Sequence, residues 1–456
     1  MTASSPTTGT ANLAEVFKAY DVRGVVPDQL DADLASAVGN AFVQVTGADQ
    51  IVVGHDMRSS SPELARAFAG GAMGAGANVS IIGLASTDEL YFASGHLASP
   101  GAMFTASHNP ARYNGIKMCR AHAVPLGSDS GLEEIRDLVS AGSRSTADRS
   151  GAVEEVDVLA AYADYLLSLV PVSGRRLKVS VDAGNGMAGH TTPAVLGGLD
   201  LDVDAMYFDL DGTFPNHEAN PIDPANMADL QTRVREVGAD LGLAFDGDAD
   251  RCFVVDERGE TVSPSVLTAL IATRELAKHP GAPIIHNLIT SRAVPQIVSE
   301  HGGKPVRTRV GHSFIKARMA ETDAVFGGEH SGHYYFRDFW RADSGMLAAL
   351  HTIAALAETD RPLSELLSEF SRFHASGEIN SIVDDQSGVL ERLESEYADR
   401  PGLNVDHLDG LTVGDEDWWF NVRASNTEPL LRLNVEASDE QTMARVRDEV
   451  LALIRG

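Results

Sequence analysis

The sequence predicts an α/β fold, with three related mixed-sheet α/β domains followed by a C-terminal α+β domain. A strand–helix–strand pattern occurs three times before about residue 311, and strands and helices follow a different order after about residue 371. With 456 residues the chain also exceeds what one hydrophobic core holds, so several domains are expected.

The first strand–helix–strand unit spans residues 49–83. The β-branched run "DQIVVGHD" precedes "SSSPELARAFAGGAMGAGA", where Ser60 and Glu63 suit a capping box and Pro62 lies in the first turn. Glycines then end the helix, and "NVSIIG" follows as the second strand. This segment therefore predicts two strands joined by a crossover helix.

The same pattern returns at residues 176–209 and 282–311, which begin with "RLKVSVDAGNGM" and "APIIHNLITSR". Such units build parallel strand pairs with helices on the faces of the sheet. Ligands bind in the loops that follow the carboxyl ends of these strands. The repeat has no fixed period, which favours separate related domains over a solenoid.

The last part of the chain has another order. We expect a strand in "GEINSIV", a helix at 387–400, strands within 410–423 and 430–437, and a final helix at 439–455 capped by Ser438 and Gln441. Candidate linkers lie at 140–153, at 256–260 and near 371. The predicted domains are therefore 1–150, 151–256, 257–370 and 371–456.

The chain is strongly acidic. It has 36 Lys and Arg residues against 65 Asp and Glu residues, which gives a net charge of −29. Such a field repels nucleic acid and anionic membranes, so we expect neither as a partner. A local cationic pocket can still hold a small phosphate.

Two features bear on the cellular compartment. The two cysteines, Cys119 and Cys252, are too few for a disulfide framework or a zinc site. The N-terminal residues lack the pattern of a signal peptide, and the longest apolar run, from Met346, is too short to span a bilayer. We expect a soluble cytoplasmic protein, and the sequence leaves open whether it is a monomer or a dimer.

Residues 243–252, "LAFDGDADRC", place Asp246, Asp248 and Asp250 at alternate positions. An extended segment points alternate side chains to one side, so the three carboxylates can converge on a hard cation such as Mg²⁺. An EF-hand is disfavoured because Arg251 stands where that loop needs glycine. A phosphatase loop with Asp246 as nucleophile and an exposed acidic turn both stay open.

A second polar loop lies in "MFTASHNPARYNGIKM", residues 103–118, where an apolar strand end leads into polar residues. Ser107 has the proton-transfer group His108 beside it, and Lys117 follows, so Ser107 is a candidate nucleophile. An ordinary Asn-Pro turn with capping hydroxyls is the alternative.

Two later loops carry further polar groups. Glu329, Ser331 and His333 in "FGGEHSGHYYF" suit sugar hydroxyls, and a His/Glu metal site is the less favoured alternative. Arg423 and the hydroxyl and amide groups after it in "NVRASNTEPLLRL" suit a phosphate, and a β-turn with an exposed arginine is the alternative.

Taken in order, "TASHNP", "DGDADR", "GEHSGH" and "RASNTEP" resemble the motifs of the α-D-phosphohexomutase family, in particular its bacterial phosphomannomutase/phosphoglucomutase branch. The resemblance extends from "FKAYDVRG" to the last helix. It implies four domains around a central cleft, hexose phosphates as small-molecule partners, Mg²⁺ as cofactor and a hexose 1,6-bisphosphate as activator and intermediate.

The resemblance also implies roles for individual residues. Ser107 would be the phosphorylated serine, and its phosphate would hold Mg²⁺ together with Asp246, Asp248 and Asp250. His108 or Lys117 would be the base, and Arg251 would act beside them. Substrate contacts are implied in four segments, at Tyr20, Arg23, Arg309, His312, Glu329, His330, Ser331, Gly332, His333, Arg423, Ser425, Asn426 and Thr427.

The implied reaction interconverts mannose 1-phosphate and mannose 6-phosphate, with glucose phosphates also accepted. "RASNTEP" is similar to the mannose/glucose branch, and "GEHSGH" differs from the glucose-restricted form. The alternatives are a phosphoglucosamine mutase, a Mg²⁺-dependent sugar phosphatase, and a phosphosugar- or metal-binding protein without turnover. One departure from the family is Arg292, which stands in a loop where dual-specificity relatives carry a lysine.

Overall fold

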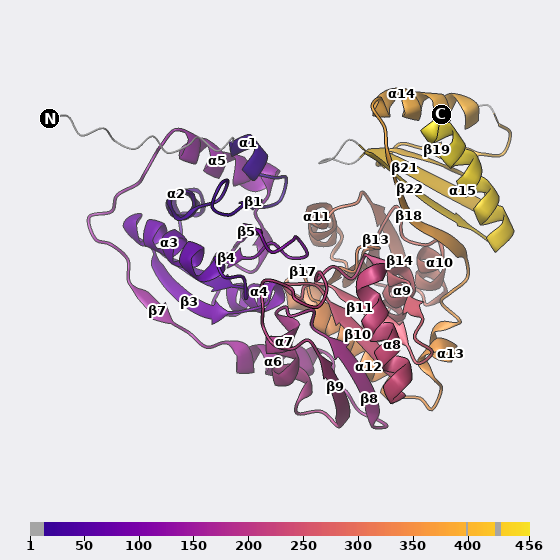
Figure 1. Ribbon diagram of the computed structural model, residues 1–456, viewed down its shortest axis with the longest axis horizontal. Helices are drawn as coiled ribbons and strands as arrows, with labels where there is room; N and C mark the ends of the chain where they lie inside the picture. Colours follow the sequence, from indigo (N-terminus) through magenta and orange to yellow (C-terminus); the bar gives the residue numbers. More distant parts are fainter. Residues whose placement is uncertain (1–12, 398–399, 425–429) are drawn as a thin grey trace. The chain divides into compact units, whose positions relative to one another are not determined.

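The structure is a computed structural model that describes residues 13–397, 400–424 and 430–456 (Figure 1). It divides into two compact units, Met1–Val262 with Ser331–Leu363, and Ser263–His330 with Ser364–Gly456. Three mixed α/β domains and a C-terminal antiparallel domain are present, so the predicted fold class is confirmed. The domain boundaries at 150, 256 and 370 stay predictions.

The first sheet lies in the first unit and is mixed, with the order β1-β5-β4-β2-β3-β7 and β6 beside β5. Its strands are β1 Val22–Val25, β2 Gln50–His55, β3 Asn78–Leu84, β4 Gly101–Phe104, β5 Tyr113–Arg120, β6 Val124–Pro125 and β7 Val153–Glu155. Its helices are α1 Leu13–Val16, α2 Ala32–Thr46, α3 Ser61–Gly74, α4 Thr87–His96, η1 Ser128–Ser130 and α5 Leu132–Ser140. Strands β2 and β3 are parallel and joined by α3, as predicted.

The core of this domain forms where α2, α3 and α5 cover the sheet. The ring of Phe68 packs against those of Phe42 and Phe104, with centroids 5.7 and 5.5 Å apart. The predicted capping box of α3 is wrong, because Ser60 makes no capping hydrogen bond and its Oγ accepts from Asn114 Nδ2 at 2.8 Å. Pro62 does lie in the first turn.

The second sheet of the first unit has the order β12-β11-β10-β8-β9. Its elements are α6 Leu159–Leu169, β8 Leu177–Asp182, α7 Ala188–Leu196, β9 Leu201–Met206, η2 Pro224–Met227, α8 Ala228–Val237, β10 Leu241–Phe245, β11 Cys252–Asp256 and β12 Thr261–Val262. Strands β8 and β9 are parallel, as predicted, whereas β10 and β11 are antiparallel. The aspartate loop therefore connects two buried, adjacent strands.

The first unit also contains the short elements after residue 331. They are β16 Tyr334–Phe336, η3 Arg337–Phe339, β17 Ala342–Asp343 and α12 Gly345–Ala357. Helix α13, Leu363–Leu367, begins at the last residue of this unit.

No helix in the described ranges is long and apolar enough to cross a membrane.

The second unit begins with a parallel set of strands, β13 Pro283–Asn287, β14 Lys304–Thr308 and β15 Phe326–Gly328. The helices beside them are α9 Pro264–Lys278, α10 Ala293–Glu300 and α11 His312–Thr322. Strands β13 and β14 are joined by α10, which confirms the third predicted strand–helix–strand unit.

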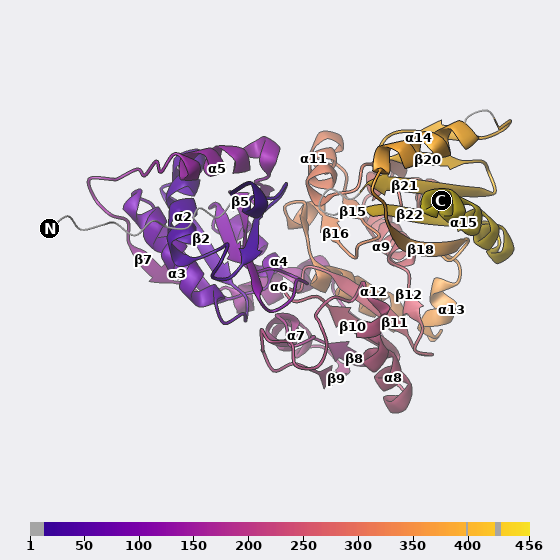
Figure 2. The ribbon, with the colours of Figure 1, turned by 45° about the horizontal axis from the view of Figure 1, so that its top comes forward.

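The C-terminal sheet is antiparallel, with the order β18-β22-β21-β20-β19. Its elements are β18 His374–Ile382, α14 Gln386–Tyr397, β19 Asn404–Asp406, β20 Leu411–Gly414, β21 Trp418–Ala424, β22 Leu430–Ala437 and α15 Glu440–Arg455. Both helices share one core with the sheet, and Figures 1 and 2 show their ribbons beside it. The predicted cap of α15 is wrong, because Asp439 is the N-cap and accepts from Thr442 N at 2.9 Å.

Candidate active site

Ser107 lies in the loop that follows β4. Its φ of 50° is in the left-handed region, which few residues other than glycine adopt, and such strain is concentrated at functional sites. Its backbone N–H donates to Thr105 Oγ1 at 2.9 Å, and its carbonyl accepts from Arg58 Nη2 at 2.9 Å. The buried serine is therefore held in an unusual conformation by its neighbours.

Arg58 is the organising residue of this loop, and sequence reasoning missed it. Its buried guanidinium donates to the carbonyls of Ser107, Asn109, Pro110 and Tyr113 at 2.7–3.0 Å and to Asp56 Oδ2 at 3.2 Å. The available signal was its position just after the carboxyl end of β2, where parallel strands present functional loops.

The aspartate loop meets the serine loop. Asp246, Asp248 and Asp250 are at most 1% exposed, which excludes the exposed acidic turn. Ser107 Oγ donates to Asp246 Oδ2 at 2.7 Å. A Cβ on Gly247 would lie 2.5 Å from the carbonyl oxygen of Ser107, so the glycine spacer allows the two loops to approach.

Lys117 supplies a positive charge among the aspartates. Its Nζ donates to Asp248 Oδ2 at 2.7 Å and to Asp250 Oδ2 at 2.6 Å, and Thr87 Oγ1 also donates to Asp248 Oδ2, at 2.6 Å. Burial opposes the charged form of Lys117, but the two carboxylates outweigh it and raise the pKa of the ammonium. Burial likewise favours neutral Asp248, but Lys117 holds the pKa of this carboxyl below its usual value.

The cationic partner of Asp246 is Arg251 rather than Lys117. Burial, followed by repulsion from Asp248 and Asp250, raises the pKa of Asp246 to about 8. Arg251 approaches it, with Nε 3.5 Å from Asp246 Oδ2, and the Arg251 backbone N–H donates to Asp246 Oδ1 at 3.2 Å.

The three aspartates fit a hard divalent cation. Oxygens from all three lie within 4.8 Å of one another. Asp248 Oδ1 and Asp250 Oδ1 are buried and accept no hydrogen bond, which is unfavourable unless another partner is bound. The residues placed to hold such an ion are Ser107, Asp246, Asp248 and Asp250.

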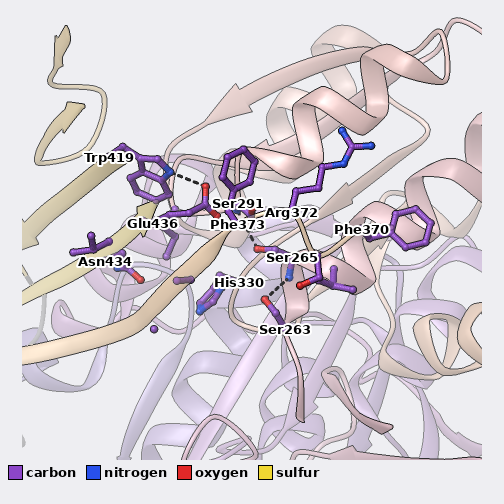
Figure 3. A pocket seen from close by; sticks show the side chains of 16 residues that line it. Ser263, Ser265, Ser291, His330, Phe370, Arg372, Phe373, Trp419, Asn434 and Glu436 are labelled. Carbon is purple, nitrogen blue, oxygen red and sulfur yellow. Dashed lines mark hydrogen bonds between the residues drawn. The ribbon is translucent and has the colours of Figure 1, made fainter. Parts of the chain in front are cut away.

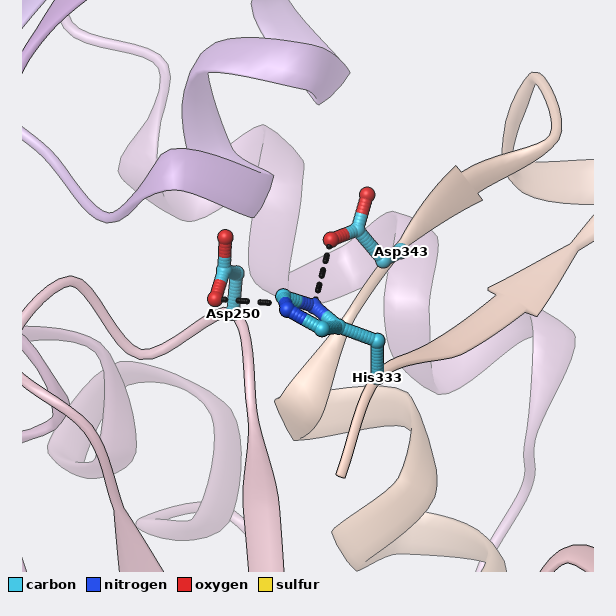
Figure 4. A group of neighbouring side chains, drawn as sticks. All are labelled: Asp250, His333 and Asp343. Carbon is cyan, nitrogen blue, oxygen red and sulfur yellow. Dashed lines mark hydrogen bonds and ion pairs between the residues drawn. The ribbon is translucent and has the colours of Figure 1, made fainter. Parts of the chain in front are cut away.

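His333 lies between two carboxylates, as Figure 4 shows. Its Nδ1 is 2.9 Å from Asp343 Oδ2 and 3.8 Å from Asp250 Oδ1. Burial and Arg251 lower the pKa of His333, but Asp250 and Asp343 outweigh them and raise it. The structure thus brings His333 to the aspartate loop, and it adds Asp343, which the sequence did not indicate.

His108, Arg23 and Tyr20 belong to the same unit. His108 Nδ1 is 3.2 Å from Ser107 Oγ, and burial together with Arg251 and Arg23 holds the pKa of His108 well below its usual value. Arg23 reaches the serine loop, where its Nη1 donates to Asn109 Oδ1 at 2.5 Å. Tyr20 is half-buried between α1 and β1.

Residues 329–333, which are predicted to bind the sugar hydroxyls, are divided between the two units. Ser331, Gly332 and His333 belong to the first unit, and Glu329 and His330 belong to the second. Glu329 Oε1 accepts from Gly311 N at 3.1 Å and from Asn287 Nδ2 at 3.4 Å. His330 lines a cavity of about 220 Å³, shown in Figure 3 together with Ser263, Ser265 and Asn434.

The remaining predicted residues lie in the second unit. Arg423 Nη2 donates to Glu378 Oε2 at 2.8 Å, and the Arg309 guanidinium stacks 4.8 Å from the centroid of the Phe314 ring. His312 begins α11. Ser425, Asn426 and Thr427 lie outside the described residues.

Arg292, which departs from the family pattern, contacts the C-terminal domain. Its backbone N–H donates to Glu436 Oε1 at 2.9 Å, and its Nη1 donates to the carbonyl of Asp415 at 2.5 Å. The guanidinium of Arg292 is therefore engaged by the C-terminal domain.

A four-domain α/β chain with a buried serine on a cluster of aspartates has the parts of a phosphoryl-transferring enzyme. Comparison with known proteins identifies the family. The phosphoglucomutase/phosphomannomutase models match in order, with alpha/beta/alpha domain I at 14–145, domain II at 160–259, domain III at 263–373 and the C-terminal domain at 378–453. The chain therefore belongs to the phosphoglucomutase/phosphomannomutase family of phosphohexomutases, which are intramolecular phosphotransferases.

Individual relatives cover nearly the whole chain. A protein described as phosphohexose mutases, from Xanthomonas campestris, is 41% identical over 96% of this chain and 99% of its own length. A phosphomannomutase from Escherichia coli is 39% identical over the same shares of the two chains. A phosphoglucomutase/phosphomannomutase family protein from Burkholderia thailandensis superposes with a TM-score of 0.89 at 34% identity, over 97% of each chain.

Proposed function

We propose that this chain interconverts mannose 1-phosphate and mannose 6-phosphate, with Ser107 as the phosphoryl carrier. The observation that carries the proposal is the contact of 2.7 Å between Ser107 Oγ and Asp246 Oδ2 in a buried cluster of acids. It supports a serine that receives and donates a phosphoryl group beside a cation site.

The substrate rests on two supports. The relatives at 39% identity are named phosphomannomutase, and the loops "GEHSGH" and "RASNTEP" are similar to the mannose/glucose branch. Glucose phosphates are expected as further substrates. Neither the phosphoglucosamine mutase nor the sugar phosphatase is favoured by the relatives.

Mg²⁺ is the proposed cofactor, held by Asp246, Asp248, Asp250 and the phosphate on Ser107. The support is the set of hard oxygen donors, two of which are buried without a hydrogen bond. When bound, the ion would neutralise charge on the phosphoryl group.

The chain's own residues carry the proton and the phosphoryl group. The bond between phosphorus and Ser107 Oγ breaks, a bond forms from phosphorus to the free sugar hydroxyl, and one proton moves in net from that hydroxyl to Oγ. His108 fits the base better than Lys117, because its Nδ1 is 3.2 Å from Ser107 Oγ whereas Lys117 is committed to two carboxylates. The bound hexose 1,6-bisphosphate then reorients and returns its other phosphate to Ser107.

The other predicted residues bind the substrate in this proposal. Glu329 to His333 orient the sugar hydroxyls, and Arg423 with Ser425, Asn426 and Thr427 binds the phosphate that does not react. Tyr20, Arg23, Arg309 and His312 add hydroxyl and phosphate contacts, and Arg251 lies beside Asp246. Charged donors such as Arg423 contribute roughly 1.5–3 kcal/mol per hydrogen bond to a phosphate.

A phosphorus NMR time course tests the function. Purified protein receives mannose 1-phosphate, Mg²⁺ and a trace of glucose 1,6-bisphosphate, and growth of the 6-phosphate resonance is expected. Release of inorganic phosphate would instead establish a phosphatase that uses Asp246. If mannose, glucose and glucosamine phosphates all remain unchanged, the protein binds phosphosugars without converting them.

A further inference from the structure

A groove of about 600 Å³ lies in the first unit, lined by residues of α3, β3 and α4 among others. The aliphatic part of its wall comes mainly from β3, the segment after β7 and the start of α6, with Ile81, Ile82, Leu84, Val156 and Leu159. Glu89 of α4, Glu155 and Asp157 bring carboxyl groups to it, and Arg66 of α3 brings one guanidinium. The groove thus combines aliphatic with polar walls and brings three carboxyl groups together with one guanidinium.

Glu89 is the unusual residue in this groove. It is 1% exposed, and its Oε2 is buried and makes no hydrogen bond. An unpaired buried carboxyl oxygen is costly, and native proteins rarely leave one without a partner. Burial, followed by repulsion from Asp88, raises the pKa of Glu89 to about 8, which reflects the lack of a nearby cation.

His190 does not supply that cation. Its Nε2 is 4.0 Å from Glu89 Oε2, beyond hydrogen-bond distance, and burial lowers the pKa of its imidazole. A metal ion fits poorly as well. Among the described residues, the two groups of ligating side chains within reach of one ion both include Asp250, and neither includes Glu89, Asp157 or His190.

We propose that this groove binds an organic cation, a small molecule with primary ammonium groups on an aliphatic chain, and that Glu89 releases its proton on binding and becomes the buried carboxylate that anchors the ligand. The aliphatic walls suit the chain of the ligand, and Glu155 or Asp157 suits a second ammonium group. The proposal does not depend on the phosphohexomutase activity.

Isothermal titration calorimetry of the full chain with putrescine, a four-carbon diamine, tests the proposal. Saturable binding is expected, and 1,4-butanediol, the uncharged analogue, should give none. Glu89→Gln should weaken the binding by at least about tenfold, because a charge-assisted hydrogen bond is lost. Glu63→Gln, an exposed change on α3, and Ser107→Ala should leave it unchanged.

Several results would overturn the proposal. The proposal fails if putrescine gives no saturable heat, if the diol binds as tightly, or if the Glu89→Gln variant keeps the same affinity. It also fails if Mn²⁺ displaces putrescine, because that would indicate a metal site. If Glu89→Gln fails to fold, Asp157→Asn replaces it, since Asp157 is exposed and its loss should weaken the diamine but leave a monoamine unaffected.

Discussion

Two regions of this molecule place cations against carboxylates, and they do so in different surroundings. In the first unit Lys117 bridges Asp248 and Asp250, whose side chains are at most 1% exposed. In the second unit Arg423 pairs with Glu378, whose side chain is 25% exposed. In the first arrangement the carboxylates are fully buried, whereas in the second Glu378 is partly exposed and also pairs with Arg432 Nη1 at 3.3 Å.

The difference indicates what each region can do. A buried pair cannot lose one partner without leaving an uncompensated charge, so we expect the Lys117 centre to be a fixed framework in the proposed phosphoryl transfer. A partly exposed pair contributes less to stability than a fully buried one, so in the proposed mechanism Arg423 would exchange Glu378 for a substrate phosphate at a smaller cost. Five substitutions test this contrast.

Ser107→Ala has the largest expected effect. It removes the phosphoryl acceptor next to Asp246, so mutase turnover should fall by on the order of 10³-fold or more. Coupled assays and circular dichroism measure turnover and folding together. Turnover close to that of the unmodified enzyme would remove Ser107 from the mechanism.

Glu89→Gln tests whether burial or pairing with a cation sets the pKa of a carboxyl group in the first unit. The pKa of Glu89 is raised from 4.5 to about 8, so the folded state holds a proton that the unfolded state has lost. The free energy of unfolding of the unmodified chain therefore decreases as pH rises from about 4.5 to 8. The variant lacks this decrease, so its free energy of unfolding relative to that of the unmodified chain should rise by up to about 4 kcal/mol between pH 5 and pH 8. Urea unfolding at both pH values measures this, with Glu63→Gln as control, and a difference that does not change with pH would refute it.

Asp248→Asn breaks the buried centre. It removes one of the two carboxylates that hold Lys117, so the free energy of unfolding should drop by on the order of 3 kcal/mol. The Mg²⁺ concentration needed for half-maximal activity should rise as well. A variant that keeps both its stability and its Mg²⁺ requirement would show that the centre is not a framework.

Arg423→Ala tests the exchangeable region. In the proposed mechanism Arg423 binds the substrate phosphate, so its loss should raise KM about 10–100-fold with a smaller change in kcat. Steady-state kinetics with mannose 1-phosphate measures both, and Arg445→Ala, an exposed change on α15, is the control. An unchanged KM would exclude Arg423 from the phosphate site.

Glu378→Gln has the smallest expected effect. Because the Arg423–Glu378 pair is partly exposed, its loss should change the free energy of unfolding by less than about 1 kcal/mol. A loss as large as that of Asp248→Asn in the same urea experiment would erase the contrast between the two regions.

The sequence predicts the parts of the site that lie in short contiguous motifs. Alternating aspartates and a serine loop after a strand are visible as residue patterns, and the structure brings them together. Arg58 and Asp343 were missed because their roles come from partners brought near by the tertiary fold. The capping box of α3 failed for the same reason, since the distant Asn114 engages Ser60. That of α15 failed locally, because the neighbouring Asp439 caps the helix in place of Ser438.

The most direct test of the central claim is to locate the phosphoryl group on the enzyme. The protein is incubated with glucose 1,6-bisphosphate and Mg²⁺, digested, and its peptides are sequenced by mass spectrometry. The account predicts a phosphate ester on Ser107 that mannose 6-phosphate removes. A phosphoryl group on Asp246, or an unmodified Ser107 in an enzyme that still turns over, would contradict it.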